Sequence, residues 1–124
     1  MLLRREPWVA DSSALWRAHD EGRLRGYVMA SAITDIFYVA RKLVGVEVAR
    51  KAVGTCPATF EICGVDRAEL ERAQALRASD FEDNLQMACA ELTHLDAIIT
   101  RDGSGFGGSS VPALTPTEAL SRLR

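Results

Sequence analysis

Four aspartates of this 124-residue chain are placed where they could do chemistry together: Asp35, Asp80, Asp83 and Asp102. Asp80 and Asp83 stand at the start of a predicted helix, and Asp102 follows a short apolar strand. Asp35 lies in the first turn of an earlier predicted helix. Helix starts and strand ends can meet at one rim of an α/β sheet, where open sheets place their sites. We therefore expect these carboxylates to share a rim.

Carboxylates gathered at one rim repel one another, and each raises the pKa of the next. A divalent cation relieves this repulsion, and Mg²⁺ and Mn²⁺ prefer oxygen ligands. Such a metal can activate water and stabilise a phosphodiester transition state. The alternative is that acids favour helix N-termini and that aspartates cap turns, which is the better explanation for any one of them alone. Their shared placement favours a metal site.

The segment Ser79–Asp102 carries most of this pattern. Ser79 and Glu82 have the spacing of a capping box, which predicts a helix start with Asp80 at the first helical position. The run Ala97–Thr100 predicts a short buried strand that ends just before Arg101 and Asp102.

The segment Asp102–Ser110, DGSGFGGSS, superficially resembles a dinucleotide-binding fingerprint, but Val-Pro follows it in place of a helix. We interpret it as a loop that Phe106 anchors. Thr100 and Ser104 flank Asp102 and could orient a water or a metal, although such hydroxyls more often satisfy backbone groups. Neither histidine has a nucleophile nearby in sequence, so serine–histidine catalysis finds no support.

The other elements alternate between strands and helices. Strands are predicted at Gly26–Ala32, Thr59–Val65 and Val111–Leu114. Helices are predicted from Pro7 to near Gly22, over Thr34–Val44 and Val46–Thr55, from the Asp66/Glu69 capping box to about Ala78, and from the capping box Thr115–Glu118. This alternation predicts one domain over residues 1–124, an α/β fold whose mostly parallel sheet is covered by helices on both faces.

Composition is ordinary for a soluble globular chain, with 48% hydrophobic and 26% charged residues and a formal net charge of −2. No basic tail indicates nucleic acid, although a local patch of arginines could still bind it. No membrane-spanning run or signal peptide is visible. The three cysteines match no zinc spacing, and we expect buried, reduced thiols in a cytoplasmic protein.

From Ser31 to Leu123 the chain resembles the PIN-domain family, which includes the VapC-type toxins of toxin–antitoxin pairs. The segments that carry the resemblance are SAITDIFYVARK, SDFEDNLQMACAELTHLDAIITRDGSGF and VPALTPTEAL. The resemblance implies a Rossmann-like three-layer α/β/α sandwich. It also implies a metal-dependent single-strand endoribonuclease that uses Mg²⁺ or Mn²⁺, an antitoxin-like protein partner and a homodimer.

The resemblance also implies roles for the acids. The family's helix-start acid maps to Asp83, with Asp80 an extra acid beside it, and the acid after the late strand maps to Asp102. The early helical acid, commonly glutamate, maps to Asp35, whose shorter side chain reaches less far. Asp35, Asp83 and Asp102 are thus the expected catalytic residues, and all four aspartates are expected metal ligands.

The chain departs from the family at its start. Family members begin with a central strand that ends in an aspartate, and this sequence, like an N-terminally truncated member, shows neither. The family's sheet places that strand between Gly26–Ala32 and Ala97–Thr100. We expect either that the natural product is longer, or that the two neighbouring strands close up or a partner chain completes the sheet. The nuclease is then expected to be weakened or inactive.

Two other readings compete with the nuclease. A response-regulator receiver needs a lysine after a late strand, but Lys42 and Lys51 are both on predicted helices, which makes that reading poor. The stronger alternative is a non-catalytic PIN-like scaffold that acts as a protein-interaction module.

Overall fold

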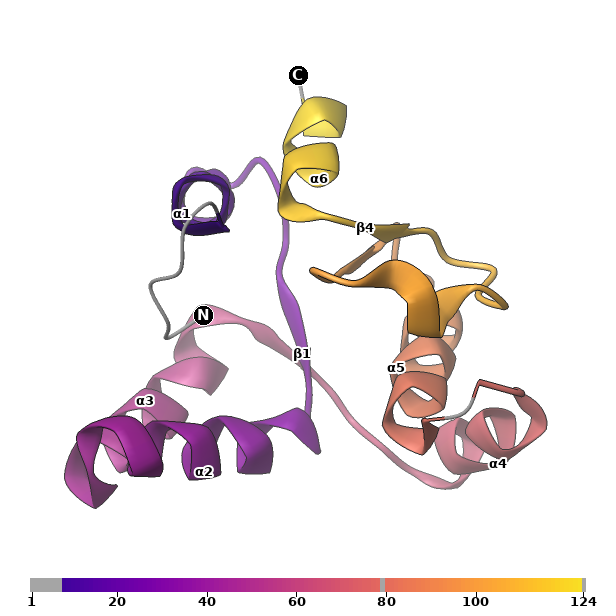
Figure 1. Cartoon of the computed structure of the whole chain (residues 1–124), viewed down its shortest axis with the longest axis horizontal. Coiled ribbons are helices and arrows are strands. Elements are labelled where there is room, and N and C mark those ends of the chain that lie inside the picture. Colours follow the sequence, from indigo (N-terminus) through magenta and orange to yellow (C-terminus); the bar gives the residue numbers. More distant parts are fainter. Residues whose placement is uncertain (1–7, 79, 124) are drawn as a thin grey trace. The chain divides into compact units, whose positions relative to one another are not determined.

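The computed structural model describes residues 8–78 and 80–123. In this part of the chain, helices alternate with short strands in one α/β series (Figure 1). The elements are α1 (Trp8–Asp20), β1 (Tyr27–Met29), α2 (Ala32–Val44), α3 (Val46–Thr59), β2 (Glu61–Cys63), α4 (Arg67–Ala75), α5 (Phe81–Leu92), β3 (Ile98–Ile99), the 3₁₀ turn η1 (Gly103–Phe106), β4 (Ala113–Leu114) and α6 (Pro116–Leu123).

The described residues form two compact units. The first unit holds residues 8–24 and 66–123, and the second unit holds residues 25–65. Each unit contains one pair of parallel strands, β3 with β4 in the first and β1 with β2 in the second. These pairs confirm the predicted α/β class with parallel strands. The expectation of one domain over residues 1–124 stays a prediction.

The second unit is a strand pair joined by a helical hairpin. Tyr27 is in register with Glu61, and Met29 is in register with Cys63. Helices α2 and α3 follow each other directly, because Gly45 turns the chain between them at a φ of 88°, where a residue with a Cβ is strained. Helix α3 extends past its predicted end at Thr55 and carries Pro57 in its last turn.

The first unit is built around α5. The side chains of this helix from Asn84 to Ala90 are buried apart from that of Gln86, and they include Met87, which is 1% exposed. Helix α4 packs along α5, and an ion pair joins Arg72 to Glu91 at 2.7 Å. The core of the first unit therefore surrounds the helix on which the expected site begins.

The strand pairing bears on how the sheet is completed. In residues 8–78 and 80–123, β1 bonds to β2 and β3 bonds to β4, as two separate sheets. How the sheet is completed stays a prediction.

Helix caps agree with the sequence at two of three places. Asp66 and Glu69 form the predicted capping box of α4. The Thr115 hydroxyl accepts from the amide of Glu118, whose carboxylate accepts in return from the amide of Thr115. At the third place Asp80, which the sequence put at the first helical position, is instead the N-cap of α5, and its carboxylate accepts from the amides of Glu82 and Asp83.

Two predicted helix signals lie outside the described residues: Ser79 and Pro7. Helix α5 itself begins at Phe81, one residue later than the capping box predicted. The three cysteines are buried, as expected. Among the described helices none is long and apolar enough to cross a membrane.

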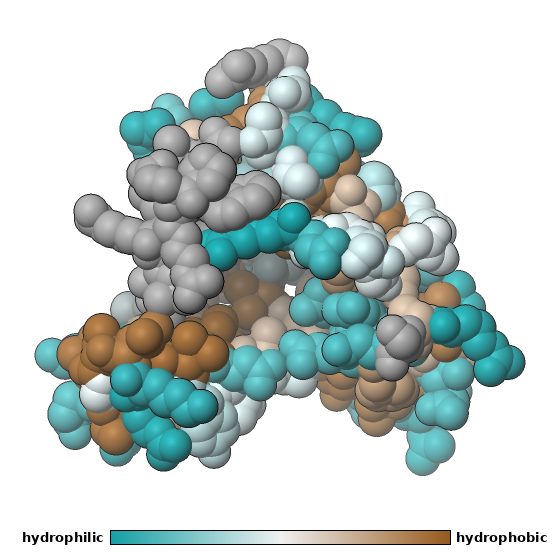
Figure 2. Space-filling view, in the orientation of Figure 1, coloured by the Kyte–Doolittle hydropathy of each residue, from teal (hydrophilic) through white to brown (hydrophobic). Residues whose placement is uncertain are grey.

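One part of the second unit exposes apolar side chains. Six large hydrophobic residues on α2 and α3 are 47–57% exposed, and we call them the hairpin patch: Tyr38, Val39, Leu43, Val44, Val46 and Val48. Figure 2 shows apolar surface gathered over this hairpin, at the lower left of the view. Exposed apolar residues grouped in this way are typical of a surface that binds another protein.

Candidate metal site at the start of α5

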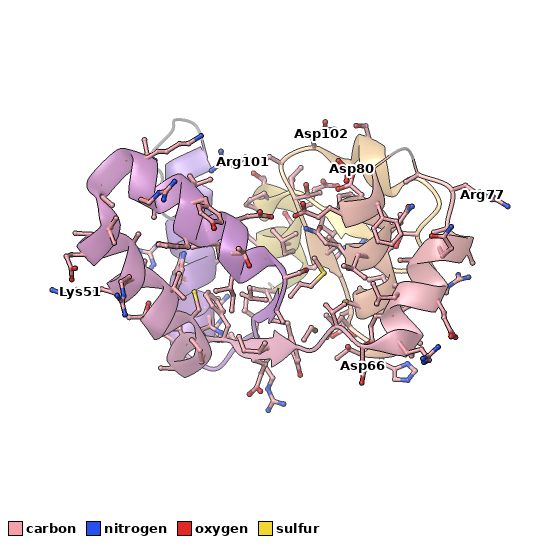
Figure 3. All side chains as sticks on the ribbon, turned by 90° about the horizontal axis from the view of Figure 1, so that it is seen from below. Lys51, Asp66, Arg77, Asp80, Arg101 and Asp102 are labelled. Atoms are coloured by element: carbon pink, nitrogen blue, oxygen red, sulfur yellow. The ribbon has the colours of Figure 1, made fainter. Side chains whose placement is uncertain are left out.

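Three of the four expected acids lie in the first unit, each at or near the start of an element. Asp80 is the N-cap of α5, Asp83 lies in its first turn, and Asp102 is the N-cap of η1. Figure 3 shows Asp80 and Asp102 on the same side of this unit, and the cap Asp66 at its opposite end. The fold therefore gathers these acids at one end of the first unit.

The surroundings of Asp83 disfavour the charged form of its carboxyl. Its side chain is partly buried, and desolvation is the main cause that raises the pKa of its carboxyl. The charges of Asp80 and then of Asp102 raise the same pKa further. Asp80 and Asp102 are therefore close enough to Asp83 to repel its charge.

Asp102 is held ionised by the turn that follows it. Its Oδ1 accepts a hydrogen bond from the amide of Ser104 at 3.0 Å, and this bond lowers the pKa of the exposed carboxyl. The Thr100 hydroxyl donates to the carbonyl of Asp102 and accepts from its amide. Thr100 therefore satisfies nearby backbone, which is the simpler of its two predicted roles.

The turn η1 also contacts Asp83. A Cβ placed on Gly105 would overlap Oδ2 of Asp83 and would lie 3.0 Å from its Cγ. The next residue, Phe106, is 7% exposed and fixes the turn to the core, as the sequence suggested. The same short turn thus bonds to one acid of the group and packs against another.

Sequence reasoning missed Asn84, which is buried one residue after Asp83. Its Oδ1 accepts from the amide of Ala78, and its Nδ2 donates to the carbonyls of Leu76 and Ala78. Asn84 thereby ties the segment before α5 to the helix. Its only sequence signal was a polar residue on the apolar face of α5.

The donor set can be tested against a divalent ion. No group of three or more histidine, cysteine, aspartate or glutamate side chains in residues 8–78 and 80–123 is arranged to hold a metal. Oδ1 of Asp80 already accepts from the amides of Glu82 and Asp83. Magnesium, however, is commonly held by one or two carboxylates together with waters and substrate phosphates. Such a site needs two acids close together, and Asp102 is close enough to Asp83 to raise the pKa of its carboxyl.

Asp35 is placed differently. It is exposed in the first turn of α2, as predicted, and it belongs to the second unit. Its membership of the site stays a prediction.

The parallel strands and the acids grouped at one end of the first unit are the features by which this chain can be compared with known families. The protein-family model described as PIN domain matches residues 1–104 of the chain. The chain therefore belongs to the PIN-domain family, as its sequence motifs indicated.

One solved structure is similar in fold. It is a chain of the structure "Toxin-antitoxin complex from Klebsiella pneumoniae", with a TM-score of 0.60 and 22% sequence identity. The similarity covers 86% of this chain and 92% of that chain. A search of curated protein sequences gave no match.

Proposed function

We propose that this chain is a PIN-type endoribonuclease that cleaves single-stranded RNA with the help of Mg²⁺ or Mn²⁺. The observation that carries the proposal is the electrostatic coupling of Asp83 with Asp80 and Asp102 in a chain of this family. PIN domains are generally nucleases that depend on divalent metals. Carboxylates that repel one another form the kind of pocket that binds a cation.

In this proposal Asp83 and Asp102 hold the ion, and Asp80 is a neighbouring charge. When bound, the metal supplies an activated water and stabilises charge on the phosphodiester. Asp102 is ready for this role, because its hydrogen bond with Ser104 keeps it ionised. A bound cation would favour the charged form of Asp83, because its positive charge offsets the repulsion from Asp80 and Asp102 that raises the pKa of this carboxyl.

The proposal is tested by incubating the chain with a 5′-labelled single-stranded RNA in millimolar Mn²⁺, Mg²⁺ or EDTA. Cleavage is expected with metal and not with EDTA, and Asp83→Asn is expected to abolish it. Asp66→Asn changes a cap at the other end of the first unit and serves as the matched control. Metal-dependent cleavage that survives in Asp83→Asn would place the chemistry elsewhere.

The second candidate function is a non-catalytic PIN scaffold that binds proteins. It is favoured by the hairpin patch and by the lack of a three-ligand group in the described residues. Melting curves separate the two functions, because a metal that binds only the native state raises its melting temperature. An unchanged Tm in millimolar Mn²⁺ supports the scaffold.

We further propose an antitoxin-type protein as the partner of this chain, because the solved structure that is similar in fold is a toxin–antitoxin complex. The hairpin patch supports a protein partner of some kind. A homodimer, from the resemblance to VapC-type toxins, and a cytoplasmic location, from the cysteines that we expect to be reduced, complete the proposal.

A further inference from the structure

The turn η1 contacts both acids to which the proposed function gives a metal. The amide of Ser104, in this turn, donates a hydrogen bond to Oδ1 of Asp102. Its third residue, Gly105, faces the carboxylate of Asp83 so closely that a Cβ would overlap Oδ2. The turn is fixed at its end by buried Phe106.

The need for glycine at position 105 does not come from the backbone. The positive φ values of glycines in the described residues belong to Gly22 and Gly45 alone. An alanine at 105 is therefore compatible with the backbone of η1, and the conflict lies with the Asp83 side chain. Because the overlapping atom is the far end of that side chain, the carboxylate can rotate away and leave the fold intact.

The other glycines of this loop lack such a contact. A Cβ on Gly103 would lie 3.9 Å from the Cβ of Ala113, which is an ordinary distance. Cβ atoms on Gly107 and Gly108 would meet nothing within 4 Å. Of the glycines in this stretch, only Gly105 has the space where a Cβ would lie occupied by a carboxylate, that of Asp83.

We propose that Gly105 is a positioning residue, whose bare Cα provides the space in which the Asp83 carboxylate lies beside Asp102. It acts through Asp83 and does not touch the substrate. This inference rests on the proposed function for the identity of the ligand, a divalent cation. The contact itself stands independently of that function.

The first test measures Mn²⁺ binding by isothermal titration calorimetry for the native chain, Gly105→Ala and Gly107→Ala. Gly105→Ala is expected to weaken Mn²⁺ binding by about 10–100-fold, the usual effect of disturbing a group that orients a metal ligand. Gly107→Ala is expected to bind like the native chain, because its φ of −59° and ψ of −28° suit alanine. Native affinity in Gly105→Ala would overturn the proposal.

The second test uses no metal. Gly105→Ala is made in the native chain and in Asp83→Ala, and the four melting temperatures form a double-mutant cycle. We expect Gly105→Ala to lower the Tm of the native chain and to leave unchanged or raise the Tm of Asp83→Ala, where the carboxylate is gone. Equal changes in both backgrounds would show that Gly105 does not hold Asp83.

The two tests fail in different ways. A native chain that binds no Mn²⁺ would show that the proposed metal-dependent function is wrong, and the thermal cycle would then still decide whether Gly105 positions Asp83. A native chain that binds Mn²⁺, together with an uncoupled cycle, would keep the function and overturn the role of Gly105.

Discussion

At the scale of single residues, Asp83 is a charge that the native chain holds at a cost. Its pKa is raised in the folded state by desolvation and by its two acidic neighbours. The folded state therefore binds its proton more tightly than the unfolded state does. The contribution of Asp83 to stability falls as the pH rises from its ordinary pKa of 3.8 through the raised folded value.

Asp83→Asn is accordingly expected to raise the Tm of the metal-free chain at pH 7, because it removes the repelled charge. The gain in unfolding free energy should be below about 1 kcal/mol, since water screens a partly exposed carboxylate. Below pH 3.8 the native carboxyl is protonated in both states, and the gain should vanish. Thermal melts from pH 3 to pH 8 measure this, and a destabilised Asp83→Asn at pH 7 would contradict it.

A second prediction at this scale concerns Asn84, whose replacement should lower the stability of the native chain. Replacing it with leucine removes one acceptor and two donors that satisfy the backbone of residues 76–78. Leaving such partly buried groups unpaired should lower the free energy of unfolding by about 1–3 kcal/mol. Gln86→Leu, a partly buried amide of the same helix, is the control. Urea unfolding monitored by tryptophan fluorescence measures both, and equal effects would deny Asn84 its special role.

At the scale of elements, the Arg72–Glu91 pair joins α4 to α5. Nε of Arg72 donates to Oε2 of Glu91 at 2.7 Å, and this bond is the main cause that lowers the pKa of Glu91. Ser110 lowers the pKa of Glu91 further. The ion pair should therefore stabilise the packing of the helix that carries Asp83.

Arg72→Met is expected to lower the free energy of unfolding at pH 7, because it removes the partner of Glu91. The carboxylate of Glu91 has a depressed folded pKa, so its contribution is present above its ordinary pKa of 4.5 and is lost as the pH falls through the folded value. The loss in Arg72→Met should shrink accordingly in acid. Arg67→Met breaks the exposed Arg67–Glu71 pair, at 3.7 Å, and should change little. Equal losses at pH 7 in the two variants, measured by urea unfolding, would contradict this.

The elements also show which features sequence can give. Apolar periodicity and capping spacing predicted the helices and the Asp66 and Thr115 caps, because these depend on residues three or four positions apart. The start of α5 was misplaced by one residue, since Asp80 and Ser79 are both good caps and sequence does not rank them. The predicted strands were longer than the observed ones, because a strand's extent is set by its partner.

The site was predictable in part for the same reason. The four acids and their match to the family motif can be recognised in the sequence. Three of these acids lie in the first unit. The close contact between Gly105 and Asp83 joins residues far apart in the chain, and so does the ladder that pairs Ile98 with Ala113. Such contacts depend on packing, which no local pattern reports.

At the scale of the whole molecule, the hairpin patch is the surface where we expect the proposed partner to bind. Helices α2 and α3 carry four basic residues, Arg41, Lys42, Arg50 and Lys51, against the two acids Asp35 and Glu47. Arg41 also lies over the ring of Tyr38, 5.2 Å from its centre. Two copies of the chain that met through this hairpin would bring like charges together, whereas an acidic amphipathic helix would complement it.

We therefore expect Leu43→Glu with Val46→Glu to abolish binding of a synthetic helical peptide that has leucines on one face and glutamates on the others. A peptide with lysines in place of the glutamates should bind the native chain at least about tenfold more weakly, because it repels the basic hairpin. Leu70→Glu changes another exposed leucine, 47%, on α4 and should bind the acidic peptide normally. Fluorescence anisotropy measures the affinities, and sedimentation equilibrium measures the oligomeric state.

If the double variant dissociates a dimer and leaves peptide binding intact, the patch joins two copies of this chain and the proposal of an acidic partner is wrong. If Leu70→Glu loses the peptide as well, the binding surface is not the hairpin.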